Sequence, residues 1–410
     1  MRRRVLSILV IAALLCTMIF SLVGCSTTKS TAPNATGSAV NLTLWGAAED
    51  QRMLSEMVEN FRKTHTDKQY KVTIRVNGED VAKDEALKDI DMAADIFSIA
   101  HDQLGALVSA GAIYENTKYI DNIKNEQLEG AVTAAQYDNK FYGYPFSAET
   151  YFLYYDKSKL TADDVTSLDK ILAKKQDDGV AKFGYDMQDA YFSGSFFITN
   201  GCELFGANGS DKNTVTFNNA HGLEVGKWLT TLKGKGVINL DGDVAGSQFK
   251  AGKLAAYVCG PWKAASYKEA LGENYGVAKL PMINFGSGDK EWKSFAGFKM
   301  YVVKSTTKYP EEAMLLANYL SNEENQTKRF NDRTLLPTNM KVAQNESVTK
   351  DPTVKAILDQ LPNCVAMPSI PQIGRFWDPT AAFTKDAFDG AIKETDIQGK
   401  LDKLVTDIKS

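Results

Sequence analysis

Cysteine and histidine are scarce in this chain of 410 residues, which contains five cysteines and three histidines. Two of the cysteines, Cys16 and Cys25, fall within or directly after the first apolar segment. Three cysteines then remain, so at most one disulfide can form in the folded part. The spacing of a metal site is absent from the histidines, which are His65, His101 and His221. These absences exclude a disulfide framework and predict a fold that rests on its hydrophobic core, without a metal or a cofactor.

Basic residues form no block beyond Arg2, Arg3 and Arg4. Without the first 24 residues the chain keeps 44 lysines and arginines against 51 aspartates and glutamates, a net charge of −7. Proteins that bind nucleic acid carry clustered lysine and arginine instead. The charge pattern therefore argues against a nucleic-acid partner.

The N-terminus has the layout of a secretory signal, in which three arginines precede an apolar segment from Val5 to Val23. The segment ends in Leu22-Val23-Gly24-Cys25, which resembles a bacterial lipobox, where the cysteine is lipidated and becomes the mature N-terminus. A plain transmembrane anchor is the alternative, because about 20 apolar residues can span a bilayer. We predict a lipoprotein signal peptide at residues 1–24 and a lipidated Cys25 that anchors the chain at the outer face of the cell membrane, with a Gram-positive surface favoured.

A flexible tether follows the signal. Ser26 to Ala39 consists of small and polar residues with one proline and one glycine, a composition that cannot bury a core. We therefore assign residues 25–39 to the tether and expect the fold to begin near Val40. The remaining length of about 370 residues predicts two domains.

The folded part alternates strands with helices. Val40 to Trp45 and Lys71 to Val76 alternate apolar and polar residues as strands do, and Glu49 to His65 between them repeats apolar residues at helical spacing. A strand, a helix and a strand in this order begin an α/β sheet. Asp102 follows a further strand at 95–100, where ligands of open α/β sheets usually bind. Single helices are expected over 160–175, 189–201 and 311–325.

One aromatic stretch stands out. Tyr144 to Asp156, reading YPFSAETYFLYYD, holds six aromatic rings with the carboxylate of Glu149 between them. A strand could bury Phe152 and Tyr154 on one of its two faces, which places Glu149 where the chain leaves a core. Glu149 is then either a chance carboxylate beside a buried strand or a residue that contacts a ligand.

Six segments in the same order resemble the maltose- and maltodextrin-binding family, which belongs to the extracellular solute-binding proteins of sugar ABC importers. They span most of the mature chain and read DIFSIAHDQLG (95–105), YPFSAETYFLYYDKSKL (144–160), QDAYF (188–192), GPW (260–262), YGVAKLP (275–281) and MPSIPQIGRFW (367–377). One short segment such as GPW would be weak evidence, whereas six in order are specific.

The resemblance implies an α/β, bilobal periplasmic-binding-protein fold of type II, in which the chain crosses between the lobes three times and the ligand lies in the cleft. The N-terminal lobe would comprise residues 40–147 and about 301–346. The C-terminal lobe would comprise about 152–295 and about 353–410.

The resemblance also assigns ligand contacts, which fall on Glu49, Asp102, Glu149, Asp189, Tyr191, Trp262 and Trp377. Gln103 joins them in place of an arginine of the family, and Trp45, at the end of the first strand, lines the cleft or packs beneath it. Sugar rings stack their C–H faces on aromatic rings, and carboxylates and amides bind their hydroxyls. We expect Trp228 to lie in the core instead and leave Trp292 open.

Some positions differ from the maltose-binding pattern. Ile99 stands in place of a tryptophan, Asp50 in place of a lysine, and Asp378 and Ala381 in place of a tyrosine and an arginine. Each difference changes a sugar contact, so the resemblance implies the family more firmly than the sugar. A malto-oligosaccharide is our first choice of ligand, with another oligosaccharide as the alternative.

The resemblance implies a monomeric binding lipoprotein that performs no chemistry and presents the sugar to an ABC permease in the membrane. A glycoside hydrolase is a second hypothesis, because it needs two carboxyl groups about 5 to 10 Å apart and could use two of Asp102, Glu149 and Asp189. Nothing in the sequence marks one of them as an acid and another as a base. A surface adhesin, the third hypothesis, would leave Trp262 and Trp377 without a shared purpose.

Overall fold

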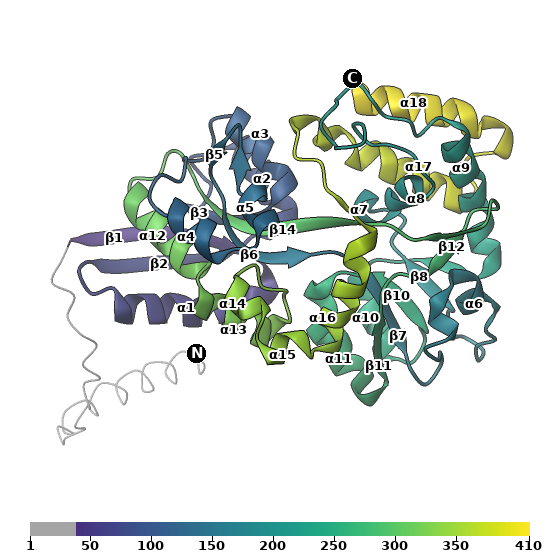
Figure 1. Ribbon diagram of the computed structural model, residues 1–410, viewed down its shortest axis with the longest axis horizontal. Coiled ribbons are helices and arrows are strands. Elements are labelled where there is room, and N and C mark those ends of the chain that lie inside the picture. The colour runs from purple at the N-terminus through teal and green to yellow at the C-terminus, as the bar shows by residue number, and fades with distance from the viewer. Residues whose placement is uncertain (1–37) are drawn as a thin grey trace, which may run out of the picture.

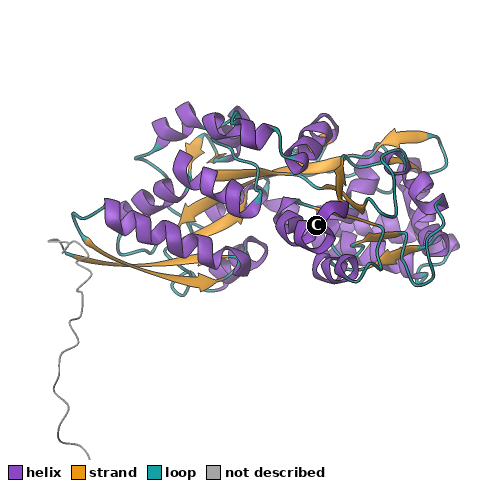
Figure 2. Ribbon diagram, turned by 90° about the horizontal axis from the view of Figure 1, so that it is seen from below, coloured by secondary structure: helices purple, strands orange, loops and turns teal. Residues whose placement is uncertain are grey.

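The structure is a computed structural model, and it describes residues 38–410. The signal peptide expected at residues 1–24, the lipid site Cys25 and all but the end of the tether lie outside the described residues. Figures 1 and 2 show two lobes side by side, each with its own sheet and helices. The two sheets contain six and five strands, and two further sheets are strand pairs, β4–β5 (Gln136–Tyr137 and Lys140–Phe141) and β12–β13 (Met282–Asn284 and Asp289–Glu291).

The sheet of the first lobe has the order β15-β14-β3-β1-β2, with β6 also paired to β14. Its strands are β1 (Ala39–Gly46), β2 (Gln69–Val76), β3 (Ile96–Ala100), β6 (Tyr144–Glu149), β14 (Ser294–Val303) and β15 (Cys364–Ala366). β1, β2 and β3 run parallel, whereas β14 runs antiparallel to β3 and β6. The carboxyl ends of the three parallel strands therefore meet at one edge of the sheet.

Two small cores cover the two faces of this sheet, because side chains alternate along a strand. Leu42 and Leu44 of β1 join the core under α1 and α12, whereas Trp45 joins the core under α2 and α3. The helices of the first lobe are α1 (Gln51–Thr64), α2 (Glu79–Lys88), α3 (Leu104–Ser109), α4 (Ile120–Glu126), α5 (Glu129–Ala134), α12 (Pro310–Leu320), α13 (Glu323–Arg333) and α14 (Met340–Ala343).

The sheet of the second lobe has the order β11-β7-β10-β8-β9 and supports the largest hydrophobic core. Its strands are β7 (Phe152–Asp156), β8 (Phe183–Tyr185), β9 (Val237–Asn239), β10 (Ala256–Cys259) and β11 (Tyr275–Ala278). The helices around it are α6 (Leu168–Ala173), α7 (Ala190–Ser193), α8 (Ser195–Thr199), α9 (Ala220–Leu232), α10 (Gly242–Lys250), α11 (Ala264–Leu271), α16 (Pro352–Gln360), α17 (Trp377–Asp389) and α18 (Ile397–Lys409).

The aromatic stretch at 144–156 is divided between the two lobes. Its first half is β6 in the first sheet and its second half is β7 in the second, so the chain crosses between the lobes at Thr150 and Tyr151. Thr150 Oγ1 lies 2.7 Å from Ser294 Oγ and donates to the carbonyl oxygen of Phe295 at 2.8 Å. These bonds join the first crossing to the second, which leads into β14.

The third crossing passes through α15 (Glu346–Thr349) into α16. Gln360 at the end of α16 accepts a hydrogen bond from the backbone N–H of Leu280 and donates to Ser294 Oγ at 3.0 Å. The predicted bilobal α/β fold with three crossings is thus confirmed. The first two crossings are hydrogen-bonded to each other at Ser294, and the helix that follows the third, α16, also binds Ser294 through Gln360. The residue boundaries given above for the lobes stay a prediction.

The three single helices expected from the sequence are wrong in length. The one at 160–175 is reduced to α6, because the carboxylate of Asp164 binds the backbone N–H and the hydroxyl of Thr161 and holds a turn there. The one at 189–201 is divided into α7 and α8 at Gly194, where an added Cβ would lie 2.4 Å from the ring of Phe376. The one at 311–325 ends at Leu320, because Asn322 caps a new helix, α13.

Two tryptophans belong to the core of the second lobe. Trp228 is buried against Phe196 and Phe285, which confirms the expectation for it. Trp292 is fully buried, and its indole N–H donates to Ser195 Oγ at 3.0 Å. Both rings therefore belong to the core of the lobe.

The cysteines of the described part, Cys202, Cys259 and Cys364, are all free thiols. Within residues 38–410, none of the helices has both the length and the apolar character that a membrane span requires.

Candidate ligand-binding site

The first lobe contributes residues from the loops after its three parallel strands. Glu49 lies in a 3₁₀ turn after β1, Glu79 begins α2 after β2, and Asp102 and Gln103 form a 3₁₀ turn after β3. The amide Nε2 of Gln103 donates to the carbonyl oxygen of Glu79 at 2.9 Å, which ties the second loop to the third. These loops lie together because the strands that carry them are parallel and adjacent.

Glu149, at the end of β6, lies beside a buried lysine that the sequence interpretation missed. Lys299 Nζ on the neighbouring strand β14 is 3.3 Å from Glu149 Oε2 and 3.7 Å from Glu79 Oε2. Burial raises the pKa of Glu149 despite the opposing charge of Lys299. Burial also tends to raise the pKa of Glu79, but the charge of Lys299 and hydrogen bonds outweigh burial and lower this pKa. The three side chains form a charged cluster, which we call the Lys299 triad.

The second lobe contributes aromatic rings. Trp262 follows β10, Tyr191 lies in α7, and Trp377 begins α17. The ring centroids of Tyr191 and Trp262 are 6.1 Å apart, those of Tyr191 and Phe295 are 6.2 Å apart, and those of Phe295 and Trp377 are 6.3 Å apart. Phe295 of β14 is itself buried in the core of the second lobe. It connects the three predicted rings into one row.

Asp189 holds the start of α7 in place. Its carboxylate accepts a hydrogen bond from the backbone N–H of Tyr191 at 2.8 Å, as an N-cap residue does. Burial raises the pKa of Asp189, and this hydrogen bond opposes the shift. Asp189 therefore fixes the position of the Tyr191 ring and keeps a second carboxylate oxygen for other partners.

Gly260 lets the Trp262 ring lie against its own backbone. A Cβ added at Gly260 would lie 2.0 Å from Cζ3 of Trp262, closer than any side chain tolerates. Only glycine lacks this atom, so the Gly260-Pro261-Trp262 sequence is required for the orientation of the indole.

The two lobes contact each other around this site. Arg333 Nη2, at the end of α13, donates to the carbonyl oxygen of Trp262 at 3.3 Å, and Lys299 Nζ lies 5.2 Å from the centroid of the Trp262 ring. The backbone N–H of Phe298 donates to Nδ1 of His101, so Nε2 of His101 donates to the carbonyl oxygen of Met367 at 3.2 Å. Burial lowers the pKa of His101 to about 4, so this ring is a neutral structural contact.

Several buried polar atoms of the site have no hydrogen-bond partner among residues 38–410. They include Asp102 Oδ1, Gln103 Oε1, the Tyr191 hydroxyl and Asn77 Oδ1, which lies in the loop before Glu79. Glu149 Oε2 and Asp50 Oδ1 also lack a hydrogen bond but lie in ion pairs. Buried polar atoms are nearly always hydrogen-bonded in proteins, so these atoms are suited to bind the hydroxyls of a ligand. Burial also raises the pKa of Asp102 to about 7, with Lys83 opposing the shift.

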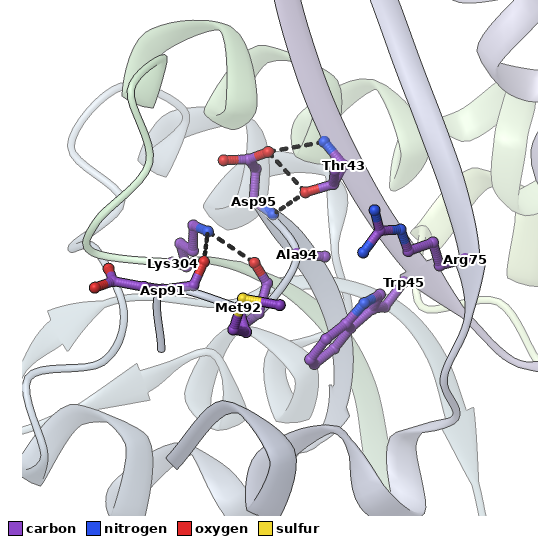
Figure 3. A pocket seen from close by; sticks show the side chains of 9 residues that line it. Thr43, Trp45, Arg75, Asp91, Met92, Ala94, Asp95 and Lys304 are labelled. Atoms are coloured by element: carbon purple, nitrogen blue, oxygen red, sulfur yellow. Dashed lines mark hydrogen bonds between the residues drawn. The ribbon is translucent and has the colours of Figure 1, made fainter. Parts of the chain in front are cut away.

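Trp45 does not join this set. Its ring packs against Phe97 on the α2 side of the first sheet and lines a separate hollow of about 300 Å³. Figure 3 shows this hollow, with Arg75 and Met92 on either side of the indole. The remaining residues expected from the sequence lie around the contact between the lobes. Glu49 takes part in this contact through an ion pair with Arg333, with 3.5 Å between Oε1 and Nη2. Their roles toward a ligand stay a prediction.

Two α/β lobes with a row of aromatic rings and buried carboxylates between them define a two-lobed solute-binding protein. The sequence model for bacterial extracellular solute-binding proteins matches residues 56–356. The chain belongs to this family.

Curated relatives match over most of their length. The galactooligosaccharide-binding protein of Bacillus subtilis (strain 168) is 28% identical over 88% of this chain and 87% of the relative. The maltodextrin-binding protein MdxE of the same organism is 27% identical over 90% of this chain and 89% of the relative. The match therefore covers both lobes in each case.

Solved structures agree. The maltodextrin-binding protein MalE1 from L. casei BL23, without ligand, is 31% identical with a TM-score of 0.78, and the match covers 91% of this chain and 99% of the other. A structure determined with acarbose is also 31% identical, with a TM-score of 0.84, and the match covers 90% of this chain and 99% of the other.

Proposed function

We propose that this protein captures a malto-oligosaccharide outside the cell, between its two lobes, and delivers it to the permease of an ABC importer. The observation that carries the proposal is the combination of the ring row with unpartnered polar atoms at Asp102, Gln103 and Tyr191. Rings accept the apolar faces of sugar units, and the polar atoms select their hydroxyls. The relatives named for maltodextrin support this choice of sugar.

A galacto-oligosaccharide is the second candidate, favoured by the galactooligosaccharide-binding relative, which is as similar to this chain as the maltodextrin-binding one. The ring row suits either sugar, because both present C–H faces. The polar atoms decide between them, since glucose and galactose differ in the direction of one hydroxyl.

Thermal shift followed by calorimetry tests the ligand. The purified protein is heated with maltose, maltotriose, maltotetraose and a galacto-oligosaccharide series, because a ligand that binds only the folded state raises the melting temperature. We expect the malto series to give the larger shifts and the tighter binding by calorimetry. Stronger binding of the galacto series would replace the proposed sugar, and no binding of either series would contradict the proposed function.

We further propose that the protein binds its sugar without cleaving it. Lys299 holds Glu149 and Glu79 in ion pairs, an arrangement that suits the binding of sugar hydroxyls. The relatives are named as binding proteins of transporters, which also supports binding without cleavage. Chromatography of maltotetraose after long incubation with the protein should return maltotetraose alone. Release of shorter sugars would identify a glycoside hydrolase instead.

The anchoring and the assembly are also proposals. Cys25 carries the lipid that holds the protein at the outer face of the cell membrane, and the protein acts as a monomer that contacts the permease. Mass spectrometry of the N-terminal peptide from membranes should show a lipidated cysteine at the mature N-terminus. In Cys25→Ser the lipid should be absent and residues 1–24 should stay attached. Light scattering of the purified protein should give the mass of one chain.

A further inference from the structure

Lys299 occupies an unusual position for a charged residue. It lies within β14, between β3 and β6, where it pairs with Ala100 and Ser147. Its side chain is only 13% exposed. The pairing of β14 with β6 shifts between Lys299 and Met300, which marks a β-bulge. The extra residue of this irregularity is Phe146 on β6, next to the segment that ends in Glu149, and irregularities of this kind are common beside functional sites. The ammonium of Lys299 lies near Glu79, Glu149 and the Trp262 ring, at the contact between the lobes.

The Lys299 triad joins three parts of the site. Glu79 belongs to the loop after β2, Glu149 ends β6 at the first crossing, and Lys299 lies on β14. The ammonium of Lys299 also lies over the Trp262 ring of the second lobe, 5.2 Å from its centroid. Burial alone would lower the pKa of Lys299, but Glu149, Glu79 and Asp50 raise it well above its usual value. The lysine is therefore charged, and its ammonium has three N–H donors.

A charged donor at this place complements the carboxylates beside it. Ionised carboxylates only accept hydrogen bonds, whereas each sugar hydroxyl both donates and accepts. Adjacent donors and acceptors bind neighbouring hydroxyls of a sugar ring in pairs, one hydroxyl giving its proton to a carboxylate and the next accepting from the ammonium. Two ion pairs leave the ammonium a donor for such a hydroxyl.

We infer that Lys299 is a ligand-binding residue that determines specificity, donating to a hydroxyl oxygen of the sugar unit stacked on Trp262, while Glu149 or Glu79 accepts from the neighbouring hydroxyl. The inference rests on the proposed function and names a residue that the predicted ligand set does not contain. The triad thereby binds only sugars in which two adjacent hydroxyls point in directions that fit its donor and its acceptor.

The experiment compares maltotriose with a set of derivatives that each lack one hydroxyl, using calorimetry on wild type and Lys299→Met. A site that binds a hydroxyl through a buried donor rejects the analogue without it. We expect wild type to bind at least one derivative about tenfold more weakly than maltotriose. In Lys299→Met this derivative and maltotriose should bind within about twofold of each other, because the partner of the missing hydroxyl is gone.

Lys263→Met is the matched control. Lys263 directly follows Trp262, but its ammonium pairs with the exposed Asp243 outside the site. This variant should keep the wild-type ranking of all derivatives. The comparison separates contact through Lys299 from a general effect of removing a lysine next to the ring.

Three outcomes would overturn the inference. Lys299→Met could weaken the binding of maltotriose and of all derivatives by one common factor. Lys299 would then only balance the charge of the carboxylates, without contacting the sugar. The variant could bind maltotriose more tightly, which would mean that the ammonium competes with the sugar for the Trp262 ring. It could also match wild type throughout.

Folding is controlled separately, because removing the lysine leaves two buried carboxylates without a cation. The double variant Glu79→Gln, Lys299→Met removes one charge of each sign and carries the same expectation for the derivatives. A wild-type protein that does not bind maltotriose would contradict the proposed function itself, and the inference with it. Binding by wild type without any change of ranking in the variants would contradict the inference alone.

Discussion

Arg333 and Trp262 are hydrogen-bonded across the contact between the lobes, with 3.3 Å between Nη2 and the carbonyl oxygen. The same guanidinium donates to the carbonyl oxygen of Glu49 at 3.2 Å and lies 3.2 Å from Asp50 Oδ1 through its Nε. One side chain therefore connects the turn after β1 with the loop that carries the indole. Closure of two lobes around a ligand is a known hinge motion, and contacts of this kind favour the closed form.

We expect Arg333→Gln to weaken sugar binding by about tenfold, since hydrogen bonds that involve a charged group contribute about 1.5–3 kcal/mol and part of this is regained by water. The loss should come from a smaller closed fraction. Small-angle scattering with saturating maltotriose should accordingly show a larger radius of gyration than wild type.

Arg75→Gln is the control for this prediction, because Arg75 is exposed and lines the separate hollow beside Trp45. It should leave both affinity and radius unchanged. An Arg333→Gln protein that closes and binds as wild type does would show that the contact follows closure without stabilising it.

Two tryptophans of the ring row should matter for binding and little for folding. Trp262→Ala and Trp377→Ala should each cost about 1–3 kcal/mol of affinity, by analogy with aromatic hot spots. The melting temperature of the ligand-free variants should stay close to wild type, because both rings are partly exposed. Calorimetry and thermal unfolding measure the two effects.

Trp228→Ala is the matched control in the core. Its buried ring packs against Phe196 and Phe285, so its removal should cost about 3–5 kcal/mol of stability and leave the affinity per folded molecule unchanged. If Trp262→Ala and Trp377→Ala unfolded the ligand-free protein in the same way and kept their affinity, their place in the binding site would be refuted.

The residues that the sequence could reveal are those whose local context is unusual. Trp262 follows Gly260-Pro261 at the end of a strand, and Trp377 lies among prolines, so the sequence predicts that both side chains lie outside the core, where binding residues concentrate. Glu149 stood out because its neighbours are aromatic. The order of strands and helices likewise indicated an α/β fold before any contact was known.

The residues that the sequence could not reveal depend on contacts far along the chain. Lys299 lies within an apolar strand, and Arg333 ends an otherwise polar helix, where each is typical of a solvent-exposed charge. Their roles follow from Glu79 and Trp262, which are more than 200 and about 70 residues away. Gly194, between α7 and α8, likewise lies against a residue far along the chain, because an added Cβ there would meet the ring of Phe376.

Gly260→Ala should reproduce much of the effect of Trp262→Ala. The added methyl group would occupy the space of the indole, so the ring must leave its position against the backbone. We expect a loss of affinity of about 1–2 kcal/mol and a changed tryptophan fluorescence of the ligand-free protein.

Gly399→Ala is the corresponding control. Gly399 lies within α18, where an added Cβ meets nothing within 4 Å. Alanine there should stabilise the helix by about 0.5–1 kcal/mol without altering affinity. Wild-type affinity in Gly260→Ala would mean that the orientation of the indole against its backbone is not required for the sugar.

The affinity should depend on pH through Asp102. Burial raises the pKa of this carboxyl to about 7 in the ligand-free protein, and a sugar hydroxyl that donates to Oδ1 would favour the carboxylate. The pKa would then be lower in the complex, so binding releases a proton. Affinity should therefore fall as the pH decreases below 7, by at most about tenfold per pH unit, and level off above it.

Calorimetry between pH 5 and pH 8.5 in buffers of different ionisation enthalpy measures both the affinity and the proton released. Asp102→Asn should bind more weakly at pH 8 and lose most of the slope, because an amide does not titrate in this range. His101 cannot produce the slope, since its pKa is lowered to about 4. Burial and the neighbouring charge of Asp189 also raise the pKa of Asp186, to about 6, but this carboxyl is outside the predicted ligand set, so Asp186→Asn should keep most of the wild-type slope. A slope that survives in Asp102→Asn and disappears in Glu149→Gln would assign the proton to the Lys299 triad instead.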